Sequence, residues 1–127
     1  MSTIKVDEIL AADGTTTTPP TIPALDTRFC TAWVNFEAIG TITILDSYNV
    51  ASITDGGVGI YTINFAVSLA NANYTWSSNN SDTTGSKPIT YSTVTPTVSA
   101  YEIRFQLVNN TYFDGERIMT QVFGGQA

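Results

Sequence analysis

The side chains of this chain that could do chemistry are carboxylates, amides and aromatic rings, since its 127 residues include one cysteine and no histidine. Without an imidazole, the chain has no Ser-His-Asp triad, no Cys-His pair and no histidine-bound metal. Asp114 and Glu116 are the most suggestive carboxylates, because two carboxyl groups can together hydrolyse a glycosidic bond. They also flank Gly115, as acidic residues do in an ordinary solvated turn, and we expect no catalysis from them.

Oxygen-bearing side chains gather at Asn79, Asn80 and Asp82, within a run from Ser77 to Lys87 that has no apolar residue. Such oxygens suit a hard cation, but their spacing matches no known calcium loop, so we expect neither a metal site nor a cofactor. The run is expected to be a solvated loop that joins two strands. We expect these three residues to contact a receptor or a partner.

Aromatic residues near expected loops are a second set of candidate contacts. Tyr112 and Phe113 would stack on sugar rings or pack against another chain, or else fill the core at the end of a strand, and the sequence leaves both open. Tyr74 and Trp76 fit the core better. Cys30 lies in an alternating apolar stretch, where a buried, unreactive thiol is the usual case.

The charge balance excludes several classes of partner. Eleven acidic against five basic side chains give a net charge of −6, and the basic residues are scattered singly, which disfavours nucleic acid and anionic membranes. The longest apolar run, Ile9–Ala12, has four residues and is far too short to span a bilayer. Asp7 and Glu8 stand where an export signal would carry basic and apolar residues, so we expect no export signal.

Alternation of apolar and polar residues predicts the elements that must position these side chains. Threonine, serine and asparagine are abundant and no stretch holds a helical period, which favours strands. The clearest alternation lies in Arg28–Phe36, Gly59–Val67 and Tyr101–Val108. In these strands we expect every second side chain, in phase with Ala32, Tyr61 and Phe105, to point into the core. Weaker strands are expected at Thr41–Leu45, Tyr48–Thr54, Asn73–Ser77, Pro88–Thr93 and Glu116–Phe123.

About eight strands without intervening helices predict an all-β fold, an antiparallel β-sandwich with two sheets around one core. Asp55-Gly56-Gly57 supplies a tight turn and predicts a hairpin between the strands that flank it. We assign the sandwich to residues 27–127.

The segment that precedes the sandwich reads as an arm and a linker. Residues 13–26 are rich in threonine and proline, which favours an extended linker. They isolate residues 1–12, whose apolar side chains are too few to bury one another and need a partner surface. These side chains are Ile4, Val6, Ile9 and Leu10.

Three stretches of the sequence resemble a module in tail-fibre and related virion proteins of tailed bacteriophages, cyanophages especially. They are Ala32–Phe36 (AWVNF), Ser47–Phe65 (SYNVASITDGGVGIYTINF) and Asn71–Tyr74 (NANY). Met1–Asp7 also resembles the start of many such fibres. The resemblance covers residues 1–7 and 32–74. Within it, this chain has Asp-Gly-Gly where the family usually has Asp-Asn-Gly, and the chain lacks the long shaft of most fibres.

The resemblance implies a homotrimer in the virion, made in the host cytoplasm, with the arm docked on baseplate, tail or capsid proteins. The β-domain would project outward, and its distal loops would meet a polysaccharide or protein of the host surface. We expect a non-enzymatic tail fibre or appendage subunit. The alternatives are an adaptor or decoration protein that joins virion components without receptor contact and, less favoured, a polysaccharide depolymerase.

Overall fold

The computed structural model describes residues 2, 14, 28–85 and 88–126, and these residues form eight β-strands and no helix. The strands are β1 (Cys30–Glu37), β2 (Thr43–Tyr48), β3 (Val50–Asp55), β4 (Ile60–Phe65), β5 (Tyr74–Ser81), β6 (Ile89–Tyr91), β7 (Ala100–Gln106) and β8 (Arg117–Gly124). Within the described ranges there is accordingly no helix long and apolar enough to cross a membrane.

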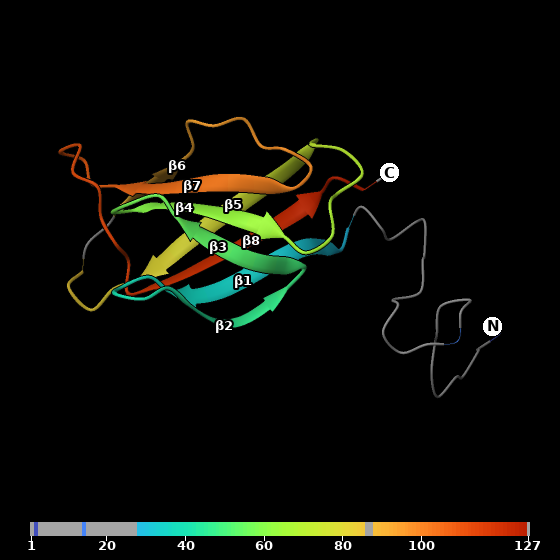
Figure 1. Cartoon of the computed structure of the whole chain (residues 1–127), viewed down its shortest axis with the longest axis horizontal. Coiled ribbons are helices and arrows are strands. Elements are labelled where there is room, and N and C mark those ends of the chain that lie inside the picture. Colours follow the sequence, from blue (N-terminus) through green and yellow to red (C-terminus); the bar gives the residue numbers. More distant parts are fainter. Residues whose placement is uncertain (1, 3–13, 15–27, 86–87, 127) are drawn as a thin grey trace.

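The strands form two antiparallel sheets of four that face each other, as Figure 1 shows. Sheet I has the order β2-β1-β8-β5, and sheet II has the order β3-β4-β7-β6. β3 and β4 pair as the hairpin that the Asp-Gly-Gly turn predicts. The predicted all-β sandwich is therefore confirmed.

The core lies between the sheets and follows the predicted alternation. Successive side chains of a strand point to opposite faces, so one face of β1, β4 and β7 is buried. The buried residues of these strands are Ala32, Val34, Phe36, Tyr61, Ile63, Phe65, Tyr101, Ile103 and Phe105. Among the aromatic residues of this set, Phe36 and Phe105 each meet Tyr61 edge to face, with centroids 5.4 and 6.4 Å apart, whereas Phe65 and Tyr101 meet in a tilted arrangement.

Several strand boundaries differ from the sequence prediction, and two of them bear on the candidate residues. Val67 was placed on the inner face, but β4 ends at Phe65 and Val67 is 71 % exposed. The segment after Ser77 was placed in a loop, but β5 continues to Ser81 because it pairs with β8 along its whole length. Backbone pairing, rather than apolar side chains, extends this strand.

The two ends of the sandwich carry different parts of the chain. Residues 38–42, 56–59, 82–85, 88 and 107–116 lie in connections at one end, which we call the loop end. The start of β1 and the end of β8 lie at the opposite end, the entry end, with residues 49, 66–73 and 92–99. Bonds between connections hold each end together, such as Gly59 N–H to Asp114 at the loop end and Ala70 N–H to Gly125 at the entry end.

Candidate functional site

The structure separates Asn79, Asn80 and Asp82, which the sequence placed in one loop. Asn79 and Asn80 are consecutive residues of β5, opposite Met119 and Ile118 of β8, so their side chains point to opposite faces of sheet I. Asn79 is exposed on the outer face. Asn80 points inward, and its Nδ2 is buried with no hydrogen-bond partner among the described residues.

Asp82 and Glu116 fix the connection that follows β5. The Asp82 carboxylate accepts hydrogen bonds from the backbone N–H of Thr84 (2.9 Å) and from its hydroxyl. Glu116 accepts hydrogen bonds from the hydroxyl of Thr83 and from its backbone N–H (3.3 Å). Both carboxylates thus fix the backbone at Thr83 and Thr84.

Asp114, the other half of the suggestive acidic pair, binds elements of the loop end. Its Oδ1 accepts hydrogen bonds from the Gly59 N–H and from the Tyr61 hydroxyl, both at 2.6 Å. Burial, followed by the bond to Asp114, raises the pKa of Tyr61 above its usual value. The described part of the chain holds no group of three or more Cys, Asp or Glu side chains placed to bind a metal.

Tyr112 belongs to a cluster of polar side chains on the outer face of sheet II. The Arg104 guanidinium donates to both carboxylate oxygens of Glu102 (2.6 and 3.1 Å) and to the Tyr112 hydroxyl (3.2 Å). The Tyr91 hydroxyl donates to the same oxygen of Tyr112 (3.3 Å). These two bonds, from Tyr91 and then Arg104, lower the pKa of Tyr112, and the bond from Arg104 lowers that of Glu102.

Phe113 lies half-buried next to this cluster. Its backbone N–H donates to the Phe105 carbonyl (3.1 Å), which holds the connection that follows β7 against that strand. Tyr112 is 36 % exposed, with its hydroxyl already bound, so neither residue is simply core or simply a free ring. Tyr74 and Trp76 pack partly buried against the core, as the sequence favoured.

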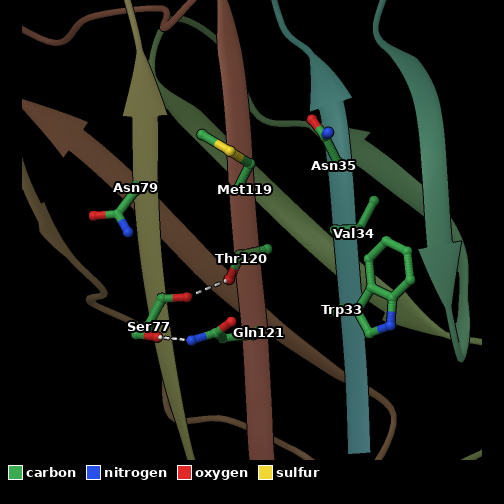
Figure 2. Close-up of a pocket in the computed structure, with 8 residues that line it drawn as sticks. All are labelled: Trp33, Val34, Asn35, Ser77, Asn79, Met119, Thr120 and Gln121. Atoms are coloured by element: carbon green, nitrogen blue, oxygen red, sulfur yellow. Dashed lines mark hydrogen bonds between the residues drawn. The ribbon is translucent and has the colours of Figure 1, made fainter. Parts of the chain in front are cut away.

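A hollow on the outer face of sheet I is the feature that sequence reasoning missed. It crosses β1, β8 and β5 and has a volume of about 280 Å³. Its lining residues are Trp33, Val34, Asn35, Ser77, Asn79, Met119, Thr120 and Gln121. Figure 2 shows Trp33 at one side of this hollow, which we call the sheet I hollow, and Asn79 at the other.

One signal in the sequence points to this face. The outward positions of β1 and β8 carry Trp33, Met119 and Phe123, where a purely solvated face would carry small polar or charged residues. Met119 and Phe123 are each more than one-third exposed. Their alignment with Asn79 depends on the pairing of three strands that are distant in sequence.

The remaining sequence candidates do not add to this site. Ile4, Val6, Ile9 and Leu10, the expected attachment residues, lie outside the described residues. Cys30 is a free thiol, partly buried rather than fully so, and it donates to the Ala32 carbonyl at 3.2 Å. No protein-family model, no curated protein and no solved structure matches this chain.

Proposed function

We propose that this chain is a structural subunit of a tailed-bacteriophage virion, a short tail fibre or appendage that recognises the host surface. It is attached through residues 1–12 to other virion proteins and assembles as a homotrimer. The resemblance of residues 1–7 and 32–74 to tail-fibre modules supports the family. The placement of the start of β1 at the entry end, opposite the loop end, supports an orientation in which the loop end points away from the virion.

The observation that carries this proposal is the position of β1. The strand begins at Cys30 at the entry end, whereas four connections gather at the opposite end. A sandwich held through the segment before Cys30 therefore presents its loop end and its sheet faces away from the holding point. The loop end is thus free to meet a surface when the chain is held at the entry end.

The acidic residues support a non-catalytic role. Asp114 and Glu116 both hold backbone N–H groups of neighbouring connections, at Gly59 and Thr83. A depolymerase needs one carboxyl group as proton donor and another facing the sugar. The hydrogen bonds of these two side chains thus account for their positions as parts of the connections that they hold.

Deletion of residues 1–12 tests the attachment. The truncated chain should keep the melting temperature of the full chain and should be missing from assembled particles, because its anchoring side chains are gone. Removal of Thr15–Thr18, which shortens the chain but keeps Ile4, Val6, Ile9 and Leu10, is the matched control and should leave incorporation intact. Normal incorporation of the chain that lacks residues 1–12 would overturn the proposed attachment.

Competition for host cells separates the fibre from the adaptor. The purified full chain should bind the host surface and reduce adsorption of intact particles. Adsorption that is unchanged at saturating chain, together with normal dependence of assembly on residues 1–12, would identify an adaptor or decoration protein instead.

A further inference from the structure

We propose that the sheet I hollow binds an uncharged sugar unit of a surface glycan. This inference deepens the proposed function and rests on it for the biological source of the glycan. The binding chemistry itself is argued from the lining residues, which combine one indole ring, one thioether, three side-chain amides and the Ser77 hydroxyl. Its volume of about 280 Å³ places it near the lower end of the roughly 300–1,000 Å³ usual for small-ligand sites.

The charges around the hollow favour a neutral ligand. None of its lining side chains is ionisable. Asp46 of β2 pairs with Asn35 at its border, and the whole chain carries a net charge of −6. The lining offers no cation, and Arg117, which lies on the same face of β8, is already paired with Glu37 at 3.5 Å. A sulfated or carboxylated glycan would therefore meet this negative field with no free cation in the lining, whereas a neutral sugar meets no such repulsion.

The amide groups supply unsatisfied hydrogen-bonding capacity. Asn35 Oδ1 is covered and has no hydrogen-bond partner among the described residues, and within the same residues the Asn79 amide forms no hydrogen bond. Gln121 Nε2 donates to the Ser77 hydroxyl (3.2 Å), and this bond orients both groups at the lower edge of the hollow in Figure 2. Sugar hydroxyls both donate and accept, so they match amides that offer an oxygen and an NH₂ group.

Trp33 and Met119 supply the apolar part of the site. Figure 2 shows the indole of Trp33 at the β2 side of the hollow and the Met119 side chain reaching from β8 toward Asn79. An indole packs against the C–H face of a sugar ring and keeps its N–H for a polar partner. Met119 has three rotatable bonds and a polarisable sulfur, so its side chain can adjust to the shape of a sugar ring beside it.

A second copy of the chain fits this face less well. In the proposed homotrimer each contact is heterologous, so filling the hollow would take a protruding surface of the next copy that also pairs with its amides. Two copies related by a two-fold axis on this face would instead place the hollow against itself and leave a void where a protein interface needs close packing. The unpaired amides of Asn35 and Asn79 would also face that void. We therefore favour the sugar and treat self-association as an outcome of the test.

The two tryptophans allow a direct measurement on the full chain. Trp33 lines the hollow, whereas Trp76 stacks on Tyr101 inside the sandwich, with ring centroids 5.9 Å apart. Neutral trisaccharides of glucose, galactose, mannose and N-acetylglucosamine are titrated to millimolar concentration while the two indole N–H signals are followed by NMR, with Trp33→Phe used for assignment. At least one trisaccharide should shift the Trp33 signal saturably and leave that of Trp76 in place.

Asn79→Ala is the test variant, because Asn79 is exposed and its loss leaves the core intact. Because this variant removes the hydrogen bonds from the Asn79 amide to the sugar, the affinity for the sugar should fall on the order of tenfold. Thr75→Ala, on the same strand and the same outer face but outside the lining, is the matched control and should bind as the unchanged chain does.

Three results would overturn the inference. The first is that no neutral trisaccharide shifts the Trp33 signal, and the second is that only acidic sugars do. The third is that the Trp33 indole is protected from solvent in concentrated samples and becomes accessible on dilution. That result would identify this face as a contact between copies. None of these results bears on incorporation into particles, so failure of the sugar site and failure of the virion role remain distinguishable.

Discussion

Phe105 shows how much of the stability of this sandwich rests on single aromatic residues. Its side chain is fully buried and meets Tyr61 at a centroid distance of 6.4 Å. Phe105→Ala should lower the free energy of unfolding by about 3–5 kcal/mol, measured by urea denaturation, because it removes a large ring from a packed core. Phe29→Ala, at a side chain that is 51 % exposed, should change it by less than about 0.5 kcal/mol. A loss below about 1 kcal/mol at Phe105 would contradict the packing described above.

Glu102 links the stability of sheet II to pH. The hydrogen bond from Arg104 lowers the pKa of this carboxyl below its ordinary value of 4.5. A lowered folded-state pKa means that the stabilisation is present above pH 4.5 and is lost as the pH falls through the folded-state pKa. We expect the free energy of unfolding to fall on acidification below pH 4.5, and to fall less steeply in Glu102→Gln.

The control for this pH series is Glu37→Gln. Glu37 forms an ion pair with Arg117 at 3.5 Å, and both side chains are about half exposed, so solvent screens the pair. Loss of the Glu37 carboxylate should therefore leave the pH dependence of the free energy of unfolding nearly unchanged. Equal slopes for Glu102→Gln and the unchanged chain between pH 2 and 5 would show that the Glu102 carboxylate does not support the fold.

At the scale of elements, the β3–β4 connection depends on Gly59. This residue has a φ of 68°, and a Cβ there would lie 2.7 Å from the carbonyl oxygens of Phe105 and Phe113. Gly59→Ala should therefore destabilise the chain by more than the about 1–2 kcal/mol of left-handed strain alone. Gly40→Ala isolates that strain, because Gly40 has a φ of 76° and open space around it. Similar melting temperatures for the two variants would contradict the close approach at Gly59.

The sequence predicted best those strands in which side-chain contrast is strong. β1, β4 and β7 alternate bulky apolar with polar residues, and their inner faces were confirmed. The sequence predicts too early an end for β5, because Ser78–Ser81 offers only polar side chains, although the backbone of this segment pairs with β8. The boundary between β2 and β3 was misplaced because Asn49, with a φ of 53°, turns the chain from one sheet to the other.

The candidate site was less predictable than the fold because it depends on register. Trp33, Ser77 and Met119 lie on three strands that meet only in sheet I. Periodicity showed that Trp33 faces outward, but no local pattern indicates which residues stand beside it. Sequence alone leaves Tyr112 undecided for the same reason, since its partners Tyr91 and Arg104 reach it from β6 and β7.

At the scale of the whole molecule, the number of copies is the first quantity to measure. The proposed fibre role predicts three copies, so light scattering on the purified chain should give close to three times 13.7 kDa. A mass of 13.7 kDa at all concentrations would contradict a self-assembling fibre and favour the adaptor, which joins only on the particle.

The position of β1 also determines how the domain would carry a load. β1 is an interior strand, bonded to β2 on one side and to β8 on the other, and its first residue lies at the entry end. Tension between a holding point before Cys30 and a ligand bound elsewhere on the domain runs along this strand. Antiparallel hydrogen bonds lie across the strand direction, so both ladders of β1 are sheared together instead of being peeled apart bond by bond. The strand that receives the pull is thus one that two neighbours restrain at once.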